Sequence, residues 1–278
     1  MTLAVILATA CAVVYGTADF FGGLATRRSK VLSVVALSQV AGLVLVLGLI
    51  PILPGSFDER ALLWGMAAGV AGAAGLVLFY RALATGTMSV VAPTTAVTSA
   101  ALPVLFGLLS GERPKAQALV GVVLALASVL LVSRGGPAEK SGSLGSILAA
   151  LAAGAGFGGF FILLSQAPDG TGMWPLFGAR LASVSIVVVL ALVTRRTLRP
   201  GGGALHIIVA AGVLDMAANV LYLLAVQEGL LSLVAVLVSL YPASTLLLAR
   251  YVLGERLHAI QVAGVACALG AVALIAVA

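Results

Sequence analysis

The sequence predicts an all-α integral membrane protein, built from ten transmembrane helices in two inverted repeats of five. Hydrophobic residues make up 62% of the 278 residues and charged residues only 9%, whereas soluble domains carry about 25% charged residues. The chain also repeats itself: residues 79–132 align without a gap on residues 222–275, at a constant offset of 143. A Gly-Glu-Arg motif at 111–113 recurs in this way at 254–256. Duplicated membrane proteins of this kind are typically transporters, with a site between the halves.

Ten apolar runs divide the chain, each close to the length of about 20 residues that a helix needs to cross a bilayer. We expect helices because lipid offers no partners to open backbone groups, and the alternating strands of a membrane β-barrel are absent. The runs lie near 2–24, 31–53, 61–83, 88–110, 114–133, 144–165, 173–194, 204–227, 230–252 and 257–277.

The longest polar loop separates the two halves, and its Gly, Pro and Ser residues are typical of a flexible linker. We therefore expect a first five-helix repeat at 1–133, a linker at 134–143 and a second five-helix repeat at 144–278. Because each repeat has an odd number of spans, the second copy must insert with the opposite orientation, which makes the repeat inverted.

Small residues recur at four-residue spacing in several runs, which allows helix backbones to approach closely. We expect these faces to pack within the fold, with a homodimer through the fifth or tenth helix as the alternative. Examples are Gly65 and Gly69 in the third run, Gly121 and Ala125 in the fifth, and Gly264 and Ala268 in the tenth.

The net charge of +6 does not indicate nucleic-acid binding, because the basic residues are scattered over short loops without an aromatic platform. They are better explained as topology signals. Most Lys and Arg residues border the odd-numbered loops, so the positive-inside rule places these loops in the cytoplasm and both termini outside.

Polar side chains inside the runs are the candidate substrate-binding residues, because an ionised group at mid-bilayer costs about 2.5–3.5 kcal/mol. Asp19 lies one turn after Tyr15, so the two share a helix face. A carboxylate at this position could bind a cation or a proton. The alternative is an interfacial group close to Arg27.

A second polar stripe lies in the eighth run. Asp215, Asn219 and Tyr222 follow the spacing i, i+4, i+7 and therefore share one helix face. We expect this face to line a cavity, with hydrogen bonding between helices as the alternative.

Aromatic and hydroxyl side chains complete the candidate site: Tyr80, Thr94, Thr98 and Tyr241. Thr94 and Thr98 share a helix face, and Thr98 and Tyr241 occupy equivalent repeat positions. Three prolines would either free carbonyls for a cavity or only kink their helices; they are Pro93, Pro103 and Pro242.

The remaining polar groups have simpler explanations. Arg180, early in the seventh run, is expected to snorkel to the interface. Glu112 and Arg113, at the end of the fourth run, are expected to end the helix and anchor the loop, with a gate ion pair as the alternative. His206 and His258 lack ligand spacing, so we expect no metal, and no cofactor motif is present.

These features resemble the EamA family of the drug/metabolite transporter superfamily: ten spans in a five-plus-five repeat, with Gly-Glu-Arg closing the fourth and ninth. The segment Tyr15–Gly23 resembles a first-span signature of one bacterial branch, and Ser239–Thr245 its ninth-span motif. The resemblance implies a basket of helices around a central cavity in the cell (inner) membrane. Helices 1, 3, 4, 6, 8 and 9 would line the cavity, and helices 5 and 10 would be peripheral. It also places both termini in the cytoplasm, opposite to the charge distribution.

We therefore expect a secondary transporter, not an enzyme, that moves a small organic metabolite or drug-like solute by alternating access. The ATP-binding pattern Gly-x-x-x-x-Gly-Lys is absent, and a proton-coupled mode would use Asp19 or Asp215. The acidic character of the buried charges favours a cationic or zwitterionic solute. The alternative is an intramembrane enzyme or a lipid facilitator. Expected partners are the solute, the lipid bilayer and a second copy of the chain, but no nucleic acid.

Overall fold

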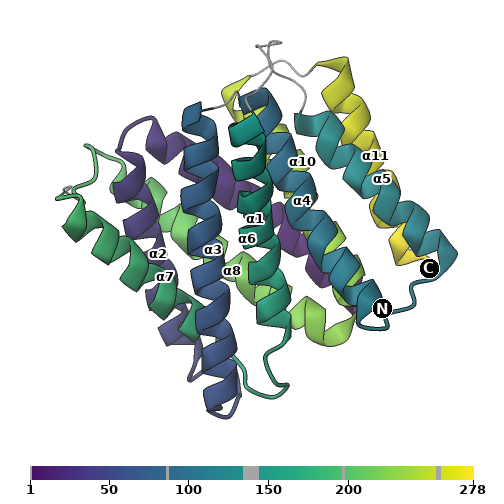
Figure 1. The fold of residues 1–278 in the computed structure, drawn as a ribbon, viewed down its shortest axis with the longest axis horizontal. Helices are drawn as coiled ribbons and strands as arrows, with labels where there is room; N and C mark the ends of the chain where they lie inside the picture. The colour runs from purple at the N-terminus through teal and green to yellow at the C-terminus, as the bar shows by residue number, and fades with distance from the viewer. Residues whose placement is uncertain (1, 86–87, 134–143, 196–197, 255–257) are drawn as a thin grey trace.

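Helices are the only regular secondary structure in the described part of the chain, for which we use a computed structural model (Figure 1). The described residues are 2–85, 88–133, 144–195, 198–254 and 258–278. The expected linker at 134–143 and the second Glu-Arg pair at 255–256 lie outside them.

The predicted spans are confirmed. Eight are long and apolar enough to cross a membrane, and two, within α4 and α5, are shorter apolar helices. The structure therefore fits an integral membrane protein with ten spans. The helices are α1 (Thr2–Thr26), α2 (Val31–Leu49), α3 (Glu59–Thr85), α4 (Met88–Leu109), α5 (Ala116–Ser133), α6 (Leu144–Ser165), α7 (Trp174–Val193), α8 (Leu205–Glu228), α9 (Leu231–Val238), α10 (Tyr241–Leu253) and α11 (Ala259–Ala276).

Proline explains the two places where the helices depart from the expected runs. The helix α2 ends at Leu49 rather than near residue 53, because Pro51 has no N–H to continue the hydrogen-bond ladder. The ninth run is divided into α9 and α10, with Pro242 in the first turn of α10. In contrast, α4 is continuous through Pro93 and Pro103.

Helices from opposite halves pack against each other throughout the bundle. The helix α3 packs on α6 and α7, while α1 packs on α8, α9 and α10. Figure 1 shows α5 beside α11 at one edge of the molecule and α2 beside α7 at the other. The peripheral position expected for the fifth and tenth spans matches that of α5 and α11 in this view.

Glycines allow these close helix contacts. A Cβ atom added at Gly65 or Gly69 of α3 would collide with the backbone of α7 at Pro175 and Ala179. On the same helix, a Cβ at Gly75 would lie 3.0 Å from Phe157 of α6. The small-residue stripe of the third run is therefore a packing face within the fold.

The small-residue faces of α5 and α11 also meet within the chain. A Cβ at Gly121 would lie 2.7 Å from Ile275, and one at Gly264 would lie 2.8 Å from Val132. The Ser128 hydroxyl donates a hydrogen bond of 2.7 Å to the carbonyl of Gly264. A homodimer stays a prediction, and it would have to use other faces of these two helices.

The first Gly-Glu-Arg motif links the two halves. Gly111 follows α4 with φ of 98°, a conformation that favours glycine at a helix end. The Glu112 carboxylate then accepts the backbone N–H groups of Leu231 at 2.7 Å and Ser232 at 3.0 Å. The motif therefore ends α4, as expected, and its carboxylate also caps the N-terminus of α9.

We expect Glu112→Ala to lower the free energy of unfolding by about 1–2 kcal/mol, because two N–H groups of α9 would lose their charged acceptor. Thermal unfolding of the purified protein in detergent measures this change. Glu228→Ala is the matched control, since Glu228 is exposed at the end of α8. Equal melting temperatures for both variants would contradict a capping role.

Candidate functional site

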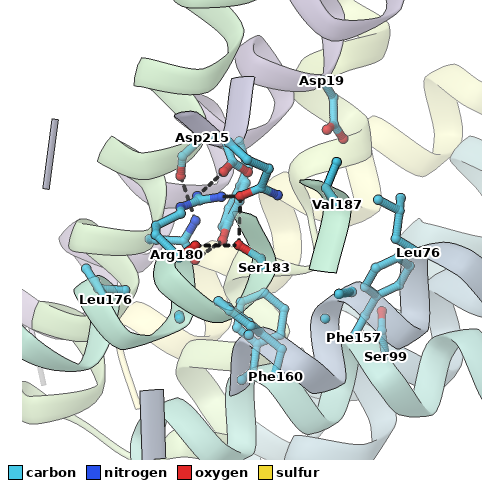
Figure 2. Close-up of a pocket in the computed structure, with 18 of the residues that line it drawn as sticks. Asp19, Leu76, Ser99, Phe157, Phe160, Leu176, Arg180, Ser183, Val187 and Asp215 are labelled. Carbon is cyan, nitrogen blue, oxygen red and sulfur yellow. Dashed lines mark hydrogen bonds and ion pairs between the residues drawn. The ribbon is translucent and has the colours of Figure 1, made fainter. Parts of the chain in front are cut away.

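A cavity of about 320 Å³ lies among helices of both halves and contains the main cluster of polar side chains (Figure 2). Its wall includes residues of the expected spans 1, 3, 4, 6, 8 and 9, and also of α2 and α7. The polar residues that line it are Tyr15, Asp19, Gln39, Ser99, Arg180, Ser183, Asp215, Asn219 and Tyr241.

Arg180 is the centre of the polar cluster. Its guanidinium pairs with the Asp215 carboxylate and donates to Gln39 Oε1. The Ser183 hydroxyl donates to the same Gln39 oxygen at 3.1 Å. Arg180 is only 7% exposed, so the expectation that it snorkels to the interface is wrong. A buried guanidinium is stable in this position because Asp215 supplies the opposite charge.

A glycine on a neighbouring helix leaves space for the side chain of Arg180. Arg180 lies inside α7, beyond the first turn that contains Pro175. A Cβ atom at Gly42 of α2 would lie 3.2 Å from Arg180 Nε and 3.3 Å from the carbonyl of Gly212. A larger residue at this position would push against the guanidinium, so Gly42 lets α2, α7 and α8 converge around it.

The three polar residues of the α8 stripe, Asp215, Asn219 and Tyr222, have different surroundings. Asp215 lines the cavity and pairs with Arg180, and Asn219 lines it while connecting two helices. The Asn219 amide donates to the backbone carbonyl of Asp215 at 2.8 Å, and its oxygen accepts the Tyr15 hydroxyl at 2.8 Å. Tyr222, in contrast, is fully buried and donates to the carbonyl of Phe161 at 2.8 Å; it is not among the residues that line this cavity.

Aromatic rings line the same cavity as Asp19. The ring of Tyr15 lies 6.3 Å from that of Tyr241 and 6.4 Å from that of Phe161, measured between centroids. Asp19 is exposed on the cavity wall, and no hydrogen bond or ion pair reaches its carboxylate from the described part of the chain. Figure 2 shows this carboxylate directed toward Val187, away from the dashed contacts of Arg180.

The candidates on α3 and α4 occupy other places. The Thr98 hydroxyl donates to the carbonyl of Thr94 at 2.8 Å, and its side chain faces Gly154 of α6. Neither threonine lines the cavity, whereas the next residue, Ser99, does. The side chain of Tyr80 lies outside the described residues.

Several cavity residues were missed from the sequence. Gln39 is a polar residue in an apolar run, so its position signalled an interior partner. Phe160 and Phe161 line the cavity but look like ordinary apolar residues of the sixth run. Periodicity along one helix could not have revealed their position.

Comparison with known proteins agrees with this architecture. The EamA-like transporter family matches residues 2–134 and again residues 144–277. One solved crystal structure is similar over 97% of this chain and 95% of that chain, with a TM-score of 0.79 and 16% sequence identity; at this identity the likeness shows the fold alone. No curated protein matches the chain.

Proposed function

The chain belongs to the EamA-like transporter family, and from this premise we propose that it is a secondary transporter of the cell (inner) membrane. It would move a small organic metabolite or drug-like solute between two faces of the membrane by alternating access. The family and the ten apolar spans indicate a multi-pass membrane transporter.

An inverted repeat is supported by the pattern of helix packing. In the two repeats, α1 corresponds to α6, α2 to α7, α3 to α8 and α5 to α11. When corresponding helices are exchanged, the α3–α6 contact becomes α8–α1 and the α3–α7 contact becomes α8–α2. All four of these contacts are present. The contacts α5–α11 and α2–α7 map onto themselves. Such a pattern is expected for a two-fold relation, and five spans in each half would place its axis in the membrane plane.

The position of the cavity carries the proposal. Tyr15 and Asp19 come from the first half, while Arg180, Asp215 and Tyr241 come from the second. A rocking movement of one half against the other would therefore open and close the cavity around a bound solute. The charges also distinguish the two carboxylates: Asp215 is neutralised by Arg180, which leaves Asp19 as the candidate for proton coupling.

Solute flux into liposomes tests this function. Purified protein is reconstituted, and radiolabelled cations, zwitterions and neutral solutes are offered with and without a proton gradient. We expect saturable flux of at least one class that exceeds the flux in protein-free liposomes. Equal flux in both preparations for every class, with correctly inserted protein, would overturn the proposal.

We also expect Ser99→Cys, in a background with Cys11→Ala and Cys267→Ser, to react with a membrane-impermeant thiol reagent. Ser99 lines the cavity, so water reaches it when the cavity is open to one side. Val123→Cys is the control, because Val123 is 67% exposed on α5 and faces lipid. Labelling of Ser99→Cys by membrane-permeant reagents alone would contradict an aqueous cavity.

A further inference from the structure

A second, apolar cavity of about 530 Å³ lies between α2, α3 and α7. It shares three lining residues, Ala73, Leu76 and Val187, with the polar cavity. The two cavities are therefore adjacent and meet at these three apolar residues. Of the described residues that line this apolar cavity, which we call the groove, Lys30 at the start of α2 is the charged one.

The charges of the polar cavity favour a positively charged ligand. Asp215 neutralises the charge of Arg180, and the arginine is buried, so its guanidinium offers an anion little unpaired positive charge. Among the described residues that line the cavity, the charged side chains are Asp19, Arg180 and Asp215, which leave an excess of one negative charge at Asp19. No hydrogen bond or ion pair from the described residues reaches the Asp19 carboxylate, so its charge attracts a cation, and more strongly inside a protein cavity than in bulk water because the effective dielectric constant is lower.

The aromatic residues beside Asp19 favour an organic cation. Tyr15 and Tyr241 line the same cavity, and ring faces attract cations within about 6 Å of their centroids. Hydrogen bonding to Asn219 fixes the Tyr15 ring, so the ring need not be ordered when the ligand binds. The side-chain oxygens of Gln39, Asp215 and Asn219 already accept protein donors, whereas a metal ion needs several free oxygen ligands and an alkylated ammonium group needs none.

Resting on the proposed transport function, we propose that the solute is an organic monocation with an apolar chain. Its ammonium group lies against Asp19 and the two tyrosine rings, and its chain passes Leu76 and Val187 into the groove between α2, α3 and α7. The positive charge of Lys30 on the groove wall disfavours a second cationic group at the end of the chain.

Ligand binding to the full-length protein in nanodiscs tests the class, with empty nanodiscs as the blank for partition into lipid. The probes are hexyltrimethylammonium, tetramethylammonium and hexanesulfonate, measured by calorimetry. We expect hexyltrimethylammonium to bind most tightly and hexanesulfonate not to bind. Asp19→Asn should weaken hexyltrimethylammonium at least about tenfold. Equal affinity in wild type and Asp19→Asn, or binding of the sulfonate with similar strength, would overturn the assignment.

A matched pair of variants tests where the apolar chain of the ligand lies. Val77 and Val70 are both 50% exposed on α3, but only Val77 lines the groove. Val77→Trp should fill the groove and weaken hexyltrimethylammonium about tenfold, with tetramethylammonium unchanged. Val70→Trp should change neither. The same affinity in both tryptophan variants would overturn the placement of the chain.

Measuring both binding and flux distinguishes a failure of the cation site from a failure of the transport function. Binding of the cation without flux into liposomes would overturn the transporter and leave the cation site in place. Flux of a neutral or anionic solute, without binding of the cation, would overturn this inference and leave the transporter in place.

Discussion

Arg180→Met is expected to lower the free energy of unfolding by about 3 kcal/mol. Breaking a buried ion pair from one side costs about 3–5 kcal/mol, because the remaining charge is left without a partner. The lower end applies here, since the side chain of Asp215 is 38% exposed toward the cavity and water can hydrate it in part. Chemical unfolding of the purified protein in detergent, followed by circular dichroism, measures the change.

Two further variants separate the charge from the packing. Arg180→Met combined with Asp215→Leu removes both charges, so the unpaired carboxylate disappears and most of the stability should return. Arg180→Lys keeps the charge but cannot reach both Asp215 and Gln39 with a planar fork, so its stability should lie between those of wild type and Arg180→Met. A double variant as unstable as the single one would show that the pair does not matter and that the shape of Arg180 does.

The ion pair also illustrates which part of the site the sequence can predict. The spacing of Asp215 and Asn219 indicated a polar face on the eighth span, and both residues do line the cavity. Their partners, Arg180 and Tyr15, come from other helices. Periodicity places residues on a face of one helix, but it does not say which faces meet, so the sequence suggested snorkelling for an arginine that is buried.

The same limit explains why Tyr222 and Thr98, which we expected in the site, do not line the cavity. Tyr222 continues the stripe of Asn219 by one turn, yet its ring is enclosed and its hydroxyl satisfies the carbonyl of Phe161. Thr98 matches Tyr241 in the repeat, but on α4 it is Ser99 that lines the cavity. Two neighbouring residues on a helix can therefore differ, one facing the cavity and the other a packed helix. Tertiary contacts determine which of the two faces the cavity.

The fold, in contrast, was predictable because lipid restricts it. Apolar runs of membrane length must be helical to satisfy their backbone groups, and the spans agree with the expected runs within a few residues. The division of the ninth span at Ser239 and Leu240 was only partly foreseen. Pro242 signalled it, but Pro93 and Pro103 gave the same signal in α4, which is continuous.

Transport is expected to fall at least about tenfold in Asp19→Asn, equivalent to about 1.4 kcal/mol, while the amount of protein in the membrane stays near normal. The substitution keeps the size of the side chain and removes its charge and its capacity to carry a proton. Stability should change little, because no hydrogen bond or ion pair from the described residues depends on this carboxylate. Flux into liposomes under a fixed proton gradient measures the effect.

Two comparisons assign the loss to Asp19 itself. Tyr15→Phe removes only a hydroxyl that donates to Asn219, so it should reduce flux less than Asp19→Asn while loosening the ring. Asp215→Asn should act mainly through stability, because it leaves Arg180 without its counter-ion. Unchanged flux in Asp19→Asn, together with an unchanged response to the proton gradient, would mean that Asp19 is only a hydrated carboxylate on the cavity wall. Coupling would then have to pass through the Arg180–Asp215 pair, the other charged group of the cavity.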